Sequence, residues 1–300
     1  MTMRFGLIGT GPWAGIAHAP GLVECPDAEL VGVWGRDPAK AADLAGRAGA
    51  RPYAGVDELI ADAEAVAFAV PPAVQAELAV RAARAGRHLL LDKPIALDVH
   101  AADTLADAVD TAGVASVVFF TDRFVDSSRD WFERVQGTPG WRGAWFRWLS
   151  TLQAPGNPYG ASPWRHEQGA LWDTGPHALS TLTAALGPVA AITATPGDGD
   201  LVTLVIRHDS GATSTATLSQ YAPPAAASFD CTLWGEAGLA PMPKRPDGKI
   251  VQIYAAAATD LVTAATTGAP TRADARLGAA IVRVLAEAQE QLDRQRPRIP

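Results

Sequence analysis

Asp173 and His177 are four positions apart and have the side-chain types that oxidation of a secondary alcohol requires. Such a reaction needs a hydride acceptor and a group that takes the hydroxyl proton. Because histidine titrates near neutral pH, His177 is the candidate general acid or base. If one helix carries both residues they share a face, so Asp173 can bind a neighbouring substrate hydroxyl or orient the imidazole.

Lys93 is the third candidate, in the segment Asp92-Lys93-Pro94 that follows an apolar run. If that run is a strand of a parallel sheet, Lys93 lies at its carboxyl end, where open α/β sheets bind their ligands. Each residue alone also has a structural explanation. A lysine before a proline is commonly a solvated charge, and a lone histidine is commonly a hydrogen-bonded structural residue. The catalytic interpretation depends on the combination.

A glycine-rich segment near the N-terminus has the spacing of a dinucleotide-binding loop. Gly9-Thr10-Gly11-Pro12-Trp13-Ala14 has the pattern G-x-G-x-x-A and directly follows the first apolar run. The first glycine permits a tight turn, the second lets a pyrophosphate approach the backbone, and the small sixth residue lets helix and strand pack closely. Amides at the start of the next helix favour phosphate groups. We predict a dinucleotide site here, with an ordinary tight turn as the alternative.

The end of the second apolar run bears on the choice of cofactor. An acidic residue about 20 positions after the loop normally binds the ribose hydroxyls of NAD. Here Gly35 takes that place and Arg36 follows. The missing carboxylate removes a repulsion, and a guanidinium can pair with a 2′-phosphate. The pattern favours NADP over NAD; Asp37 as ribose ligand and Arg36 as a solvated loop charge are the alternatives.

The first 121 residues alternate short apolar runs with helical patterns. The apolar runs predict strands, and the stretches between them have helical spacing. Such alternation predicts a parallel sheet with helices on both faces, a doubly wound Rossmann domain over residues 1–121. The predicted strands are 3–8, 30–34, 65–70, 88–91 and 114–120, and the predicted helices are 38–48, 73–85 and 98–112.

Residues 122–300 have a different character and predict an α+β domain with an open, mainly antiparallel sheet. Segments 201–208 and 212–221, joined by the turn 209–211, predict a hairpin. Residues 141–150 predict a further strand, and 271–294 a long helix that could pack back on the first domain. Loops are expected at 222–227 and 241–248, and the catalytic cleft is expected between the two domains.

The composition excludes several other classes of protein. The 300 residues are 48% hydrophobic with a net charge of −7, which suits a globular fold and lacks the dense basic surface of a nucleic-acid binder. Cys25 and Cys231 have no metal-type spacing and form no disulfide framework, so no metal site is predicted. No apolar stretch reaches about 18 residues. We expect a soluble cytoplasmic protein that binds neither nucleic acid nor membrane.

Three motifs in order resemble the Gfo/Idh/MocA family, the glucose-fructose oxidoreductase and inositol dehydrogenase type. They are the glycine loop, Asp92-Lys93-Pro94 where the family usually has Glu-Lys-Pro, and the segment from Gly169 to His177, which resembles G-x-x-x-D-x-G-x-H. The resemblance spans nearly the whole chain. It implies an oxidoreductase that moves a hydride between NAD(P) and a secondary alcohol or carbonyl of a sugar, polyol or related small molecule.

The resemblance also implies roles for particular residues. Lys93 would contact the reacting hydroxyl beside the nicotinamide and relay its proton, and Pro94 would follow a cis peptide bond. The predicted cofactor-binding residues are Gly9, Thr10, Gly11, Pro12, Trp13, Gly35, Arg36, Pro71, Asp92 and Lys93. The predicted substrate-binding residues are Lys93, Arg123, Trp164, Arg165, Trp172, Asp173 and His177, although core packing is the alternative for each tryptophan. Three arginines would suit an anionic substrate if they face the cleft: Arg123, Arg147 and Arg165.

The resemblance favours a homodimer or homotetramer. An aromatic-rich sheet face, with Trp141, Trp145 and Trp148 as candidates, would be covered by a partner subunit, because large exposed apolar patches are rare.

Three departures from the family pattern leave the substrate, and the activity itself, open. Asp92 is one methylene shorter than the usual Glu, Gln75 stands where many members have His, and Ser180 replaces a frequent Asp. Two alternative functions follow. One is a glycosidase- or lyase-like member that recycles a tightly held cofactor, and the other is a non-catalytic NADP-sensing protein.

Overall fold

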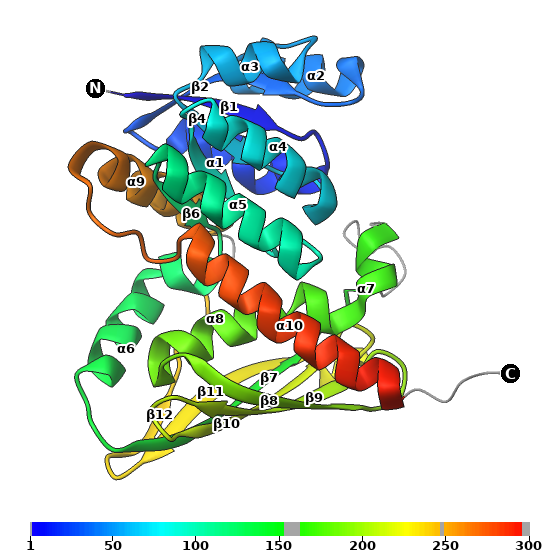
Figure 1. The fold of residues 1–300 in the computed structure, drawn as a ribbon, viewed down its shortest axis with the longest axis vertical. Helices are drawn as coiled ribbons and strands as arrows, with labels where there is room; N and C mark the ends of the chain where they lie inside the picture. The colour runs from blue at the N-terminus through cyan, green and yellow to red at the C-terminus, as the bar shows by residue number, and fades with distance from the viewer. Residues whose placement is uncertain (1, 153–162, 247–248, 296–300) are drawn as a thin grey trace, which may run out of the picture. The chain divides into compact units, whose positions relative to one another are not determined.

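The computed structural model describes residues 2–152, 163–246 and 249–295 (Figure 1). The chain forms two compact units, each with its own six-stranded sheet. The first unit comprises Met1–Phe124 and Pro246–Val282, and the second comprises Val125–Arg245 and Arg283–Pro300. The long helix α10 (Ala275–Gln295) has residues up to Val282 in the first unit and residues from Arg283 in the second. Pro246–Val282 thus belong to the first unit, although the sequence predicts one domain over residues 122–300 whose last helix could pack back on the first.

The sheet of the first unit is entirely parallel, with strand order β3-β2-β1-β4-β5-β6. The order reverses between β1 and β4, and right-handed crossovers therefore place helices on both faces. This confirms the predicted doubly wound Rossmann sheet. The strands are β1 (Met3–Ile8), β2 (Ala28–Trp34), β3 (Arg51–Pro52), β4 (Ala65–Phe68), β5 (His88–Leu91) and β6 (Ser116–Val118).

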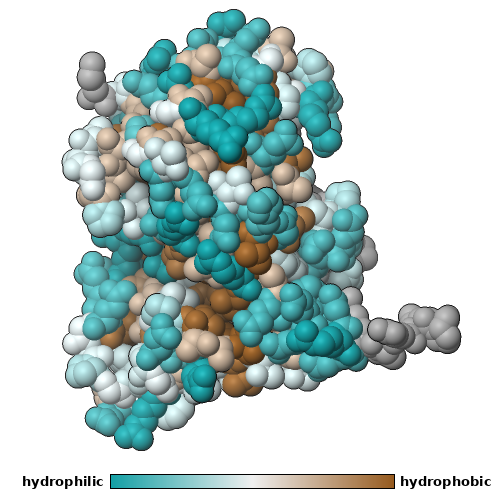
Figure 2. All heavy atoms as spheres, in the orientation of Figure 1, coloured by the Kyte–Doolittle hydropathy of each residue, from teal (hydrophilic) through white to brown (hydrophobic). Residues whose placement is uncertain are grey.

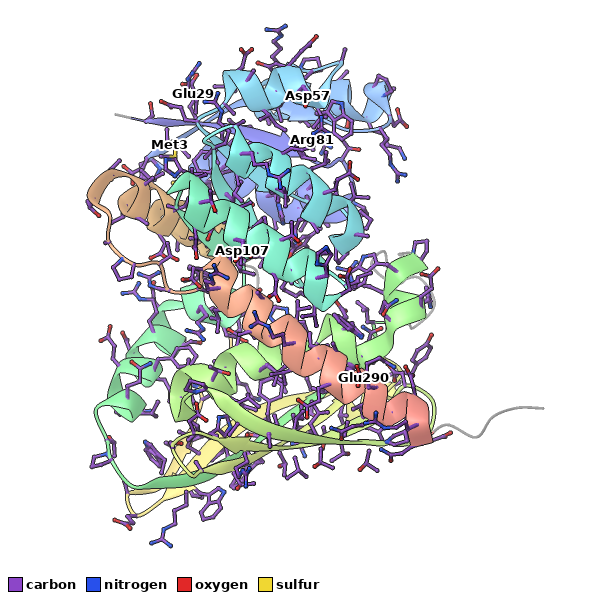
Figure 3. The ribbon with its side chains drawn as sticks, in the orientation of Figure 1. Met3, Glu29, Asp57, Arg81, Asp107 and Glu290 are labelled. Carbon is purple, nitrogen blue, oxygen red and sulfur yellow. The ribbon has the colours of Figure 1, made fainter. Side chains whose placement is uncertain are left out.

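The helices of the first unit include one that lies far away in the sequence. Helix α9 packs against α1, and α4 packs against α5. Asp57 of α3 pairs with Arg81 of α4, both labelled in Figure 3. Helices α2 and α3, at the top of Figure 2, are covered mostly by hydrophilic residues. The elements are η1 (Ala14–His18, a π-helical turn), α1 (Ala19–Glu24), α2 (Pro38–Ala48), α3 (Val56–Asp62), α4 (Pro72–Arg84), α5 (Val99–Ala112), η2 (Thr121–Phe124) and α9 (Ile250–Thr267).

The sheet of the second unit is mixed and mostly antiparallel, with order β12-β11-β7-β10-β9-β8. Among the described strands of this second sheet, only β7 and β10 pair in parallel. The predicted hairpin is present as β9 and β10. The strands are β7 (Trp141–Leu149), β8 (Val189–Pro196), β9 (Val202–His208), β10 (Thr213–Ser219), β11 (Ser228–Gly235) and β12 (Gly238–Pro241).

Helices cover one face of this sheet. Helix α8 contacts β7 and β10, and α6 and α7 pack against α8. Strand β7 alternates accordingly, with Ala144 and Phe146 buried and Trp145 and Arg147 exposed. The helical elements of this unit are α6 (Asp126–Gln136), α7 (Pro163–Asp173), α8 (Gly175–Leu186), η3 (Pro224–Ala226) and the second half of α10. Among the described residues, no helix combines the length and hydropathy needed to cross a bilayer.

Candidate functional site

The predicted dinucleotide loop turns at the carboxyl end of β1. Gly9 has φ +131°, and a Cβ there would lie 2.3 Å from the carbonyl oxygen of Ala69, so only glycine fits. A Cβ at Gly11 would have no other atom within 4 Å. Gly9 therefore lets β1 pass close to the end of β4, and Gly11 leaves open space beside the exposed Pro12 at the start of the helix. These residues fit the bound pyrophosphate that the motif predicts.

The next strand end, after β2, carries the residues predicted to choose the cofactor. A Cβ at Gly35 would lie 2.6 Å from Thr10 Cγ2, so an acidic side chain there would have to displace Thr10. Asp37 caps α2: its Oδ1 accepts hydrogen bonds from the amides of Ala39 and Lys40 at 3.0 and 3.2 Å. Arg36 is exposed between them.

The end of β5 carries Lys93. The carboxylate of Asp92 accepts the Lys93 amide at 2.8 Å through Oδ1. The Lys93–Pro94 peptide is cis, as the family resemblance implies. The strand ends of β2, β1, β4 and β5 are consecutive in the sheet, so Arg36, Gly9, Pro71 and Lys93 follow one edge.

Gln75 holds this turn from α4. Its Oε1 accepts the Asp92 amide at 2.8 Å, and its Nε2 donates to the Asp92 carbonyl at 2.8 Å and, at longer range, to that of Pro94 at 3.3 Å. The side chain is buried. Gln75, which stands where many members of the resembling family have His, thus bonds the backbone on both sides of Lys93.

In the second unit, Asp173 and His177 lie on two successive helices. Asp173 ends α7 and His177 is in the first turn of α8, with Thr174 between the two helices. One helix therefore does not carry both residues, and the shared helical face considered above is absent. Gly169, with φ +64° and ψ −165°, kinks α7 four residues before Asp173. Only glycine adopts this backbone conformation readily, so Gly169 sets the direction in which α7 delivers Asp173.

Two donors hold the Asp173 carboxylate. Arg165 Nε lies 3.2 Å from Oδ1, and Gln220 Nε2 donates to Oδ2 at 2.8 Å. Arg165 also packs over Trp164, its Cζ 4.8 Å from the ring centroid. Gln220 was not a sequence candidate, because its partner is 47 residues away. With both oxygens engaged, Asp173 is suited to a fixed acceptor for a substrate hydroxyl, which leaves proton transfer to His177.

A cavity of about 690 Å³ lies in the second unit, lined by α7, the β8–β9 connection and the end of α10. Asp200 on its wall accepts hydrogen bonds from Ser219 Oγ at 2.7 Å and from the Gln220 amide at 2.9 Å. Since Gln220 also binds Asp173, a short chain of hydrogen bonds links this wall to the predicted catalytic carboxylate.

His177 is buried and its ring lies 5.2 Å from that of Trp148. Phe229 packs edge-on against Trp148 at 5.4 Å, and the Arg245 guanidinium lies 5.9 Å from the Trp148 centroid. Trp148 is thus on the helix-covered face of the sheet, which corrects its assignment to a partner-covered face. Strand alternation from the exposed Trp145 contains the signal that would have placed it there.

The other predicted substrate residues have structural contacts. Trp172 is buried and donates to Gln289 of α10 at 3.2 Å, as a core residue would. Arg123 donates to the Arg272 carbonyl at 3.0 Å. Burial lowers the Arg123 pKa to about 10, partly offset by the charge of Asp274. Arg147 is exposed on the outer sheet face, and Ser180 is buried in α8.

Lys93 belongs to the first unit, and Asp173 and His177 belong to the second. Within the described residues, no group of three His, Cys, Asp or Glu side chains is arranged to hold a metal ion.

Residues 3–120 match the oxidoreductase family with an NAD-binding Rossmann fold, and residues 140–240 match the GFO/IDH/MocA C-terminal domain. The chain belongs to the Gfo/Idh/MocA family. Each family segment covers one of the two sheets described above.

Curated relatives align with part of this chain. An uncharacterized oxidoreductase, ORF334 of Rhizobium meliloti, is 39% identical over 114 residues, which are 37% of this chain and 34% of that protein. The inositol 2-dehydrogenase of Rhizobium meliloti (strain 1021) is 36% identical over 126 residues, 41% of this chain and 38% of that protein. These alignments span little more than a third of the relatives' own length.

Solved structures of similar fold cover nearly the whole chain. GenD2 from gentamicin A biosynthesis, in complex with NAD, has a TM-score of 0.85 at 22% identity, covering 98% of this chain and 95% of that one. The WlbA dehydrogenase from Bordetella pertussis, in complex with NADH and UDP-GlcNAcA, has a TM-score of 0.83 at 20% identity, covering 99% and 98%. Both show the fold, and departures such as Asp92 and Gln75 are therefore substitutions within an intact Gfo/Idh/MocA architecture.

Proposed function

We propose that this chain is an NAD(P)-dependent dehydrogenase or reductase acting on a secondary alcohol or carbonyl of a sugar, polyol or related small molecule. The observation that carries the proposal is the edge of the first sheet, where an open glycine loop follows β1 and Lys93 follows β5, with β4 between the two strands. Open α/β sheets bind dinucleotides and substrates at such an edge. Family membership and the named activities of its relatives support the same chemistry.

Each of three residues has a distinct role in this proposal. The bound nicotinamide supplies the hydride acceptor or donor. Lys93 binds the reacting oxygen and exchanges a proton with it, His177 is the general acid or base, and Asp173 accepts a hydrogen bond from a neighbouring substrate hydroxyl. Arg165 and Gln220 hold Asp173 in a fixed orientation for that contact.

The measurement that tests the function follows nicotinamide absorbance with NADP and NAD across a panel of sugars, polyols and inositols. Turnover by the native chain that vanishes in Lys93→Met supports the proposal. If no compound of the panel changes the nicotinamide absorbance, net dehydrogenation is contradicted. If the purified protein then carries tightly held cofactor, the redox-recycling glycosidase or lyase becomes the better hypothesis. If there is no turnover and the bound cofactor exchanges with solution, the sensing protein becomes the better hypothesis.

NADP is the proposed preferred cofactor. Thr10 fills the space that an acidic residue at position 35 would need, and Asp37 is engaged as the cap of α2. These contacts leave Arg36 as the side chain suited to a 2′-phosphate at this strand end.

The Arg36→Ala variant tests this preference. It should weaken NADP(H) binding about tenfold or more, the effect of losing a charge-assisted hydrogen bond, and change NAD(H) binding little. Arg47→Ala, at the other end of α2, removes an equal charge that is paired with Asp43 at 3.0 Å and serves as the control. Equal losses of NADP(H) and NAD(H) affinity in Arg36→Ala would refute the assignment.

We also propose that the protein is a homodimer or homotetramer. The sheet face opposite α8 exposes large apolar side chains, Trp145 at 38%, Val205 at 45% and Trp234 at 41%. Such a patch is commonly covered by a partner. Light scattering after size exclusion should give a molar mass that is a multiple of 31.3 kDa. The Val205→Lys variant should lower this mass toward that of the monomer. A monodisperse native monomer at working concentration would contradict this assembly.

A further inference from the structure

A buried polar cluster in the first unit has no role in the proposed mechanism. It consists of His18 at the end of η1, Tyr254 of α9 and Asp92 before Lys93. His18 is 1% exposed and Tyr254 is completely buried. Burying polar side chains costs free energy unless they are hydrogen-bonded, so a cluster of this kind calls for an explanation.

Tyr254 and His18 form a stacked, hydrogen-bonded pair. Tyr254 Oη lies 3.1 Å from His18 Nδ1, and the ring centroids are 4.3 Å apart with 28° between the planes. Phe119 packs edge-on against both rings, at 4.8 Å from Tyr254 and 6.4 Å from His18. Two segments distant in the sequence, at Phe119 and Tyr254, therefore hold the imidazole.

The Tyr254 hydroxyl is the hydrogen-bond partner of one imidazole nitrogen, Nδ1. Burial raises the pKa of the Tyr254 hydroxyl well above its ordinary value, and the charge of Asp92 adds to that rise. The hydroxyl therefore stays protonated; when it donates to Nδ1, the ring proton is on Nε2. Nε2 makes no hydrogen bond among the described residues and lies 3.7 Å from Asp92 Oδ2.

The other contacts of Asp92 all bear on the position of Lys93. Oδ1 accepts the Lys93 amide at 2.8 Å, and both backbone groups of Asp92 bind the Gln75 side chain. The Asp92 carboxylate thus accepts the Lys93 amide at one oxygen, and its other oxygen faces the His18 Nε2 at 3.7 Å.

We propose that His18, oriented by Tyr254, is a positioning residue for Lys93. The buried Nε2–H attracts Oδ2 and fixes the carboxylate, which in turn holds the Lys93 amide. Without this donor, Oδ2 turns away from the core and toward the ammonium of Lys93. The inference rests on the proposed catalytic role of Lys93. It also gives α9 a function, because this helix brings Tyr254 from the C-terminal part of the chain into the dinucleotide-binding unit.

Lysine acetylation tests the proposal without a substrate. The chain has only four lysines, at positions 40, 93, 244 and 249, and the Lys40 side chain is 70% exposed. Brief treatment with sulfo-NHS-acetate, followed by peptide mass spectrometry, gives the Lys93 rate relative to Lys40. Tyr254→Phe, which keeps the stacked ring, should slow Lys93 about threefold or more, the size of one hydrogen bond. His18→Gln keeps an acceptor and a donor and should retain most of the native rate.

Phe119→Leu is the matched packing control. It loosens the same two rings but removes no polar group, so its melting temperature should fall while the Lys93 rate stays native. Equal slowing of Lys93 in Phe119→Leu and Tyr254→Phe would overturn the proposal and reduce the cluster to core packing. Unchanged Lys93 acetylation in both His18→Gln and Tyr254→Phe would overturn it as well.

Nitrogen NMR of the ¹⁵N-histidine-labelled protein tests the direction of the hydrogen bond. The native protein should show His18 as the Nε2–H tautomer, and Tyr254→Phe should shift it toward a mixture. A native Nδ1–H tautomer would overturn the assignment.

Turnover separates this proposal from the proposed function. With a substrate found in the nicotinamide panel, Tyr254→Phe should lower kcat while KM for the cofactor stays unchanged. If no substrate is found but Tyr254→Phe slows Lys93 acetylation, positioning stands and the dehydrogenase assignment fails. If turnover is native in Tyr254→Phe, the dehydrogenase assignment stands and positioning fails.

Discussion

The sheet edge of the first unit and the α7–α8 junction of the second hold their functional residues by different means. At the edge, backbone geometry dominates: Gly9 passes close to Ala69, and Gln75 binds the main chain around Lys93. At the junction, side chains hold side chains, with Arg165 and Gln220 on the Asp173 carboxylate.

This difference predicts how each region responds to substitution. A backbone-held turn cannot relax without moving the strand that it follows, so edge variants should cost folding free energy. A carboxylate with two donors keeps one when the other is removed, so junction variants should disturb orientation more than folding.

The largest effect is expected for Gly9→Ala. An alanine at φ +131° with its Cβ 2.3 Å from a carbonyl oxygen forces β1 and β4 apart, which should destabilise the first unit by about 3 kcal/mol or more. Gly11→Ala meets no atom and should unfold like the native chain while binding NADP(H) weakly. Thermal unfolding and cofactor titration of both variants measure this contrast; a Gly9→Ala protein of native stability would break the backbone-held description.

Gln75→Leu should have the next largest effect. It leaves the amide and carbonyl of Asp92 without their side-chain partner in a buried site, at a cost of about 2–3 kcal/mol. Hydrogen exchange should accelerate at Asp92–Ile95 and leave β7–β12 unchanged. Gln75→Glu, which retains the acceptor for the Asp92 amide but loses the donor, should lie between the leucine variant and the native chain.

Arg165→Met sharpens the comparison from the other side. The Arg165 and Asp173 side chains are 19% and 8% exposed, so the pair is screened somewhat by water, and its loss should cost about 2 kcal/mol. Because Asp173 keeps Gln220, the second unit should stay folded while turnover falls about tenfold through a misplaced substrate hydroxyl. Arg147→Met, on the outer sheet face, is the control of equal charge. Native turnover in Arg165→Met would show that Gln220 alone orients Asp173.

The same contrast explains which parts the sequence predicts. The glycine loop and the strand ends follow from local patterns, because backbone geometry selects particular residue types at fixed spacing. The doubly wound sheet and the β9–β10 hairpin follow from apolar alternation.

The remaining features depend on partners far away in the sequence. Gln220 reaches Asp173 across 47 residues, and Tyr254 reaches His18 across 236. Local patterning predicts no helix over Ile250–Thr267, and α9 packs against α1, η1 and strands of the first sheet. Such contacts arise from tertiary packing, which a single sequence does not encode as a local pattern.

The smallest expected effect is a pH dependence that each unit shows separately. Burial lowers the pKa of His208 in β9 below its ordinary value of 6.5, and likewise that of His88 in β5. Between the folded and unfolded pKa values the unfolded chain binds more protons, so stability is complete at higher pH and falls as pH drops below about 6.5. The slope of unfolding free energy against pH cannot exceed about 1.4 kcal/mol per pH unit for each histidine.

Hydrogen exchange between pH 7 and 5 tests this dependence. The His208→Gln variant should reduce the loss of protection in β9 and β10, and the His88→Gln variant should reduce the loss of protection in β5 and β6. If either variant flattened both sheets equally, the two units would unfold together, and the separate treatment of edge and junction would lose its basis.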